Sequence, residues 1–268
     1  MIAPVTDELA LNEASMCEKC CSLSDAVASH TPSSLSRRAM LGLAVASSAA
    51  LTLRGGAWAK DATQAKAPPK PQNVLTPDAS LARLMAGNAR YVAGTSKRHD
   101  FAHEREALAG GQNPFAAVLG CADSRIAPEY AFDTARGDLF VCRVAGNFAS
   151  DESIASLEYA VAVLNTPLIL VLGHDACGAV DATIKSLKDS TTLPGHLPSL
   201  VTALSPAVKA SAQQQGNPLD NAIKQNVIDN VARLIAATPI LSAAVQQAKL
   251  RVVGGIYRLR DGRIDMVG

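Results

Sequence analysis

The sequence predicts an α/β fold, in which helices flank a mostly parallel central sheet and a C-terminal hairpin adds an antiparallel edge strand. Continuous apolar runs of strand length cover 114–120, 138–146 and 167–173, and they alternate with segments whose apolar residues recur at helical spacing. This alternation is typical of a parallel sheet with helical crossovers. Near the C-terminus, the runs 250–259 and 263–267 flank the turn sequence Arg-Asp-Gly, which favours a hairpin.

Helices are expected where apolar residues recur every three or four positions between a polar N-cap and a glycine or proline. The segments with this pattern are 78–94, 101–109, 153–165, 178–188 and 218–237. The Pro-, Ser- and Gly-rich stretch 190–217 is expected to be mostly loop, with a short helix near 199–212.

Composition divides the chain into three parts. Residues 1–59 form an N-terminal extension that ends in an export signal. Residues 60–77 contain four prolines and several lysines, which is typical of a linker. Residues 78–268 carry all the predicted strands and helices, so they are expected to form the folded domain.

The export signal is predicted from paired arginines and from the residues that follow them. Arg37 and Arg38 precede a mild apolar run and a small-residue cleavage motif, so the signal resembles the twin-arginine type. Cleavage after Ala59 would give an exported, periplasmic protein whose partners include the twin-arginine export machinery. The apolar run is too short to span a bilayer comfortably, so no stable membrane span is expected after processing. The alternative is a loose hydrophobic helix that two arginines precede by chance.

Charge and cysteine content exclude other classes of protein. A net charge of +1 without a basic stripe, together with 4% aromatic residues, argues against a nucleic-acid partner. Three of the six cysteines lie upstream of the predicted cleavage site. The three that remain are an odd number, so a disulfide framework is not expected.

Metal-ligating side chains follow two of the predicted strands. Cys121 comes directly after the run 114–120, and His174 comes directly after 167–173, with Cys177 three residues later. Because the carboxyl ends of parallel strands meet at one edge of a sheet, we expect these side chains to converge. Two thiolates and one imidazole with an open fourth position are typical of catalytic zinc, with one ion per chain. The alternative is that both cysteines are small buried apolar residues.

A carboxylate and a guanidinium lie close to the first of these cysteines. Asp123 and Arg125 are two and four residues past Cys121, and the arginine can clamp the carboxylate in a bidentate pair. A carboxylate held in this way can accept a hydrogen bond from a water molecule on the metal and orient it. The alternative is an ordinary exposed ion pair of little energetic value.

The two motifs together resemble those of the β-class carbonic anhydrases. "CADSR" is similar to their Cys-x-Asp-x-Arg motif and "GHDACGAV" to their His-x-x-Cys motif, and the resemblance covers 78–268. It implies reversible hydration of CO2 to bicarbonate and a proton by attack of a zinc-bound hydroxide, which makes the protein a zinc lyase. By this resemblance, Cys121, His174 and Cys177 bind Zn2+, and Asp123 and Arg125 are catalytic.

The resemblance also implies a substrate pocket and an oligomer. Gln112, Phe140, Tyr159 and Gly178 match substrate-binding positions of the family. Part of that pocket comes from a neighbouring subunit, so a homodimer or a higher even oligomer is expected. Val118 stands where the bicarbonate-inhibited branch has tryptophan, so the chain resembles the plant-like branch.

Two other functions remain open from the sequence. A CS2 or COS hydrolase would use the same fold and zinc, and a non-catalytic zinc-binding protein would keep the ligands alone.

His99 and His103 are spaced for one helical face, but charged neighbours favour a solvated face over a second metal site. His196 is expected in a loop, and Cys142 is expected to be a buried structural thiol on a strand.

Overall fold

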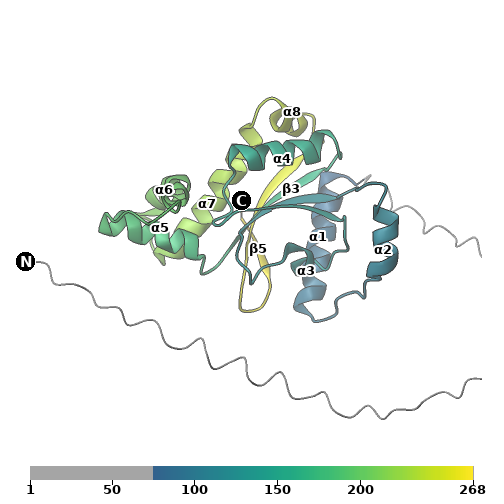
Figure 1. Ribbon diagram of the computed structural model, residues 1–268, viewed down its shortest axis with the longest axis horizontal. Helices are drawn as coiled ribbons and strands as arrows, with labels where there is room; N and C mark the ends of the chain where they lie inside the picture. Colours follow the sequence, from purple (N-terminus) through teal and green to yellow (C-terminus); the bar gives the residue numbers. More distant parts are fainter. Residues whose placement is uncertain (1–74, 268) are drawn as a thin grey trace, which may run out of the picture. The chain divides into compact units, whose positions relative to one another are not determined.

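The computed structural model describes residues 75–267 (Figure 1). The export signal, the three cysteines before it and nearly all of the linker lie outside the described residues. Among residues 75–267, no single helix is long and apolar enough to cross a membrane. The pair formed by α7 (Pro218–Ala236) and α8 (Ile240–Gln246) meets the length and composition test only jointly, and it is bent by 88°.

The described residues form a five-stranded sheet in the order β2-β1-β3-β4-β5. The strands are β1 (Ala116–Gly120), β2 (Leu139–Arg143), β3 (Leu168–His174), β4 (Arg251–Tyr257) and β5 (Ile264–Val267). The first four strands pair in parallel, and β5 pairs antiparallel with β4 as the second strand of the C-terminal hairpin. The predicted fold class is therefore confirmed.

Alternating side chains of the central strands face two separate helical layers, as the two-residue period of a strand requires. On one face, Leu119 and Val171 pack with apolar residues of α4–α8, and on the other Val118 and Leu170 pack with α1 and α3 (Figure 1). The remaining bounds are α1 (Pro77–Val92), α2 (Phe101–Leu108), α3 (Pro128–Ala131), α4 (Asp151–Ala162), α5 (Gly178–Asp189) and α6 (Pro198–Ser211). Because the middle strands are buried on both faces, they read as continuous apolar runs in the sequence.

Several elements differ from the predictions at their ends. Helix α4 begins at Asp151 because the Ser150 hydroxyl accepts a hydrogen bond from the backbone of Ser153 and so caps the helix earlier than expected. Strand β2 ends at Arg143, three residues before the end of its apolar run. The short helices α3 and α8 were not predicted, since four and seven residues are too few to show a helical period.

Candidate metal centre

The three predicted metal ligands meet at the carboxyl ends of β1 and β3. These strands are neighbours in the sheet, so Cys121, directly after β1, lies beside His174, the last residue of β3. Cys177 follows a sharp turn and is the N-cap residue of α5. The two sulfur atoms and a ring nitrogen of His174 all lie within 4.8 Å of one another, and all three residues are buried.

The hydrogen bonding of His174 leaves one ring nitrogen for a metal ion. The histidine is wholly buried, and its Nδ1 lies 2.8 Å from the carbonyl oxygen of Asp175. The other nitrogen, Nε2, is buried and has no hydrogen-bond partner within residues 75–267. An Nδ1–H that donates to a carbonyl leaves Nε2 with a free lone pair, as metal-binding histidines require. The donor set of two sulfurs and one imidazole fits Zn2+.

The two thiols influence each other strongly. The hydrogen bond with Cys177 lowers the pKa of Cys121 to about 4, while that same bond and burial raise the pKa of Cys177. Burial alone would lower the pKa of His174, but the nearby Cys121 sulfur and its charge raise it overall. A divalent cation that bound both sulfurs would require both as thiolates, so its binding would release any proton that they hold.

Asp123 and Arg125 form the bidentate pair that the sequence predicted. Arg125 Nε lies 2.9 Å from Asp123 Oδ1, and Arg125 Nη2 lies 2.7 Å from Oδ2. The arginine also donates to the carbonyl oxygen of Ala176, at 3.3 Å, just before Cys177. Its hydrogen bonds hold the pKa of the Asp123 carboxyl well below the usual range. Oδ2 of Asp123 lies 3.9 Å from His174 Nε2, so the carboxylate faces the ligand cluster.

Two residues that form hydrogen bonds at this corner, Arg143 and Gly146, were missed by the sequence analysis. Arg143, at the end of β2, donates to the carbonyl oxygens of Cys121, Asp123 and Ile126 at 2.6–2.8 Å. The backbone N–H of Gly146 donates to the Sγ of Cys121 at 3.3 Å. The run "RVAGN" (143–147), which begins at the last residue of β2, was the available signal, because β2 lies next to β1 and its end must reach the same corner.

The predicted substrate-binding residues divide into two groups. Gly178 lies at the corner, directly after the last ligand, as the first residue of α5. Gln112 is exposed and precedes the amino end of β1, whose five residues span about 16 Å. Phe140 lies opposite Ala117 near the same end, and its ring packs 6.3 Å from that of Tyr159. The described chain therefore does not bring Gln112, Phe140 or Tyr159 to its own metal ligands.

Three other sequence predictions can be compared with the structure. His99 precedes α2, so the expected helical face shared with His103 is wrong. The side chain of His99 is only 21% exposed and lies 3.3 Å from Glu104, because the chain before α2 folds back on that helix. Cys142 lies on β2 as expected but is half-buried, since β2 is an edge strand. His196 is in an exposed turn, as predicted.

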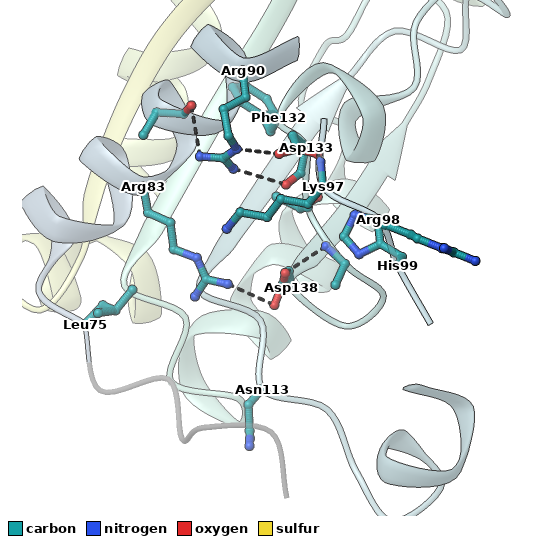
Figure 2. Close-up of a pocket in the computed structure, with 13 residues that line it drawn as sticks. Leu75, Arg83, Arg90, Lys97, Arg98, His99, Asn113, Phe132, Asp133 and Asp138 are labelled. Carbon is teal, nitrogen blue, oxygen red and sulfur yellow. Dashed lines mark hydrogen bonds and ion pairs between the residues drawn. The ribbon is translucent and has the colours of Figure 1, made fainter. Parts of the chain in front are cut away.

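A charged cavity of about 450 Å³ lies beside α1, and none of the three predicted ligands lines it (Figure 2). Two of its arginines form ion pairs with aspartates. Arg83 lies 3.2 Å from Asp138, and Arg90 lies 2.5 Å from Asp133, as the dashed lines of Figure 2 show. These contacts attach α1 to the segment after α3, so we assign them to stability.

Comparison with known sequences identifies the family to which the chain is similar. Residues 116–264 match the sequence profile of the family described as carbonic anhydrase. Carbonic anhydrase 2 of Mycobacterium tuberculosis is 40% identical over 188 residues, which cover 70% of this chain and 91% of that protein. A carbonic anhydrase of Mycolicibacterium smegmatis is 38% identical over 191 residues, which cover 71% of this chain and 93% of that protein.

Solved structures show the same fold. A tetrameric β-carbonic anhydrase from Sordaria macrospora superposes with a TM-score of 0.57 at 25% identity, over 70% of this chain and 97% of that one. A Coccomyxa β-carbonic anhydrase in complex with acetazolamide gives a TM-score of 0.53 at 27% identity, over 69% of this chain and 80% of that one.

Proposed function

The chain belongs to the β-class carbonic anhydrase family and is a carbonic anhydrase, and from this premise we propose that it hydrates CO2 reversibly with one Zn2+ per chain. Cys121, His174 and Cys177 would hold the ion. The observation that carries the proposal is the orphaned Nε2 of His174, buried within 4.8 Å of two sulfurs and 3.9 Å from a clamped carboxylate. A purely structural zinc site would use a fourth protein ligand.

Zinc bound at this corner would act as a Lewis acid that lowers the pKa of a water molecule from about 15.7 to about 7. The residues of the chain would orient this water molecule. Asp123 is ionised at neutral pH because Arg125 holds its pKa down, so its oxygens can only accept hydrogen bonds. With Oδ2 turned toward the ligand cluster, Asp123 would accept a hydrogen bond from a water or hydroxide held there and so would orient its oxygen lone pair toward CO2.

Arg125 is assigned a restraining role. Its two contacts with Asp123 occupy both carboxylate oxygens, and its contact with the Ala176 carbonyl ties the pair to the turn before Cys177. A free carboxylate so close to the cluster would itself become the fourth ligand and close the open position. The guanidinium therefore keeps Asp123 as an acceptor and prevents it from becoming a ligand.

The substrate pocket is proposed to form between two copies of the chain. Gln112, Phe140 and Tyr159 lie away from their own chain's ligands, and Tyr159 is 47% exposed. A twofold assembly that buries this surface would bring the three residues to the metal corner of the partner. The assembly would then be a homodimer or a higher even oligomer, and the Sordaria relative is described as tetrameric.

Assignment to the plant-like branch is also proposed, and it rests on Val118. This valine is wholly buried on β1, and it offers neither the bulk nor the hydrogen-bond donor of the tryptophan that the other branch has there. We therefore expect an open site near neutral pH that bicarbonate does not inhibit.

The activity is tested by stopped-flow hydration of CO2 on protein of known zinc content, with COS and CS2 hydrolysis measured on the same preparation. The proposal expects CO2 hydration that scales with zinc content. Faster hydrolysis of COS or CS2 than hydration of CO2 would replace the substrate. Full zinc content without any of the three reactions would make the protein a non-catalytic zinc binder.

Export by the twin-arginine route is proposed from the sequence alone. Replacing Arg37 and Arg38 by lysine should keep folded protein in the cytoplasm, and the exported wild-type protein should begin at Lys60. Cell fractionation and mass spectrometry of the exported N-terminus measure both. Normal export of the double variant would contradict the proposal.

A further inference from the structure

The segment between β2 and α4 contacts the first zinc ligand through its backbone. The N–H of Gly146 donates to the Sγ of Cys121, and Gly146 has a φ of 87°, which an L side chain rarely adopts. A Cβ at this glycine would lie 2.8 Å from the side chain of Leu204 on α6. The segment is thus packed closely from one side, so the position of its N–H depends on what holds it from the other.

Two buried asparagines of α7 hold that segment. Asn226 is 2% exposed, and its amide nitrogen donates to the carbonyl oxygen of Gly146 at 2.8 Å. Asn230 is 7% exposed, and its side-chain oxygen accepts from the N–H of Ala149 at 2.7 Å. The amide nitrogen of Asn230 in turn lies 3.0 Å from the side-chain oxygen of Asn226. Helix α7 therefore forms hydrogen bonds with the segment at two residues, Gly146 and Ala149.

We infer that Asn226 and Asn230 are positioning residues for the metal centre, which aim the Gly146 N–H at the Cys121 sulfur. The inference rests on the proposed function, because it assumes that Cys121 binds zinc. An N–H bond to a metal-bound thiolate draws charge from the sulfur and fixes its direction, so its loss weakens the metal site. The asparagines act from a helix that supplies no ligand.

The hydrogen-bond partners of Asn226 and Asn230 support a role in the metal centre. Val227 and Leu234 of α7 lie in the apolar core, so the two asparagines are polar side chains buried next to apolar ones. Burying an amide is unfavourable unless its hydrogen bonds are made, and these two amides make theirs with the ligand-contacting segment and with each other. Arg143 holds the carbonyl side of Cys121, so the ligand is fixed from both sides.

Asn88 offers a matched control within the same chain. It is a buried asparagine on α1, 4% exposed, and its amide nitrogen donates to the carbonyl oxygens of Ala131 and Gly262. Its oxygen accepts from the backbone of Ile264. It therefore makes buried amide hydrogen bonds, three where the side chain of Asn226 makes two, on the opposite face of the sheet and without contact to a segment that touches a ligand.

The experiment compares Asn226→Leu and Asn88→Leu with the wild-type zinc protein. We measure unfolding, the rate of zinc transfer to a chelator and, after exchange for cobalt, the thiolate-to-cobalt charge-transfer band. Both variants should lose stability. Only Asn226→Leu should lose zinc about 10 to 100 times faster and shift the charge-transfer band. Asn226→Ser, whose hydroxyl is too short to reach Gly146, replaces the leucine variant should that variant not fold.

Equal zinc release and an unshifted band in both variants would overturn the inference and leave the asparagines as structural. A wild-type protein that holds zinc but hydrates no CO2 would refute the proposed activity and leave this inference intact. A wild-type protein that holds no zinc would overturn both.

Discussion

The two ends of the parallel strands differ in how completely one chain builds them. At the carboxyl end, Cys121, His174 and Cys177 are buried, and each is held by backbone contacts or by a helix start. At the amino end, Gln112 is exposed and Tyr159 is 47% exposed beside the edge strand. The metal corner is therefore complete in a single chain, whereas the amino end presents side chains that meet none of its own ligands.

This difference separates what the metal requires from what the substrate requires. A metal ion needs fixed donors in one place, and adjacent strand ends supply them locally. CO2 is small and uncharged, so the residues that surround it need only line a pocket, and a second copy of the chain can provide them. Changes at the two ends should accordingly have different consequences.

The largest effect should come from the ligands themselves. Cys121→Ser or His174→Ala should remove most of the zinc and reduce CO2 hydration to background, because three donors fall to two. Zinc content by atomic absorption and stopped-flow hydration are measured together. Cys142→Ser is the control, since this thiol lies on β2 outside the ligand cluster and should leave the zinc in place. Full zinc occupancy in either ligand variant would refute the assignment.

The next largest effect should come from Arg125, also at the carboxyl end of the strands, where positioning of Asp123 can be separated from metal binding. Arg125→Ala should keep its zinc but lose CO2 hydration by about 10²-fold, because Asp123 is freed to occupy the open position. Arg258→Ala, which removes another exposed arginine from an aspartate pair, should change neither quantity. Unchanged hydration in Arg125→Ala would show that the clamp has no catalytic role.

The pH profile tests the same clamp. Since the pKa of Asp123 lies well below the usual range, its carboxylate stays ionised through the neutral range and adds no inflection there. Activity of the wild-type protein should rise with pH through one apparent ionisation at or above about 7. A second inflection between pH 5 and 8 that Asp123→Ala abolished would contradict the depressed pKa.

The smallest effect lies away from both ends, in the charged cavity beside α1. Burial would raise the pKa of Asp133, but the hydrogen bonds from Arg90 and from the backbone of Lys97 lower it overall. Asp133→Asn should cost roughly 1.5–3 kcal/mol of unfolding free energy and leave zinc and activity unchanged. The positive φ of Asp133 suits asparagine, so the substitution removes charge without backbone strain.

The pH dependence of the stability that Asp133 contributes follows from its lowered pKa. The extra stability of the wild type should be fully present above the unfolded-state pKa of about 3.9, and it should vanish as the pH falls through the lower folded-state pKa. Denaturant unfolding of both proteins at pH 7 and at acid pH measures this difference. A wild-type advantage that grew on acidification would contradict the assignment.

The sequence predicts the metal corner well because its signals are local. Cys121 and His174 each follow an apolar run, and parallel pairing of neighbouring strands is enough to bring them together. Asn226 gave no signal, because its partner Gly146 is 80 residues away and only the packing of α7 on the sheet joins them. His99 was misassigned because the four-residue spacing to His103 was read as a helical face, although the predicted helix 101–109 and the observed α2 both begin after His99.

The most direct test of a pocket shared between chains is complementation. Cys121→Ser lacks a ligand but keeps Gln112, whereas Gln112→Ala keeps the ligands, and each variant alone should be weakly active or inactive. When the two are co-expressed with different tags and random twofold oligomers form, about one site in four combines an intact metal corner with an intact Gln112 from the other chain. We predict that CO2 hydration by the mixed oligomer rises toward one quarter of the wild-type value. Activity no higher than the average of the two separate variants would show that each chain builds its pocket alone.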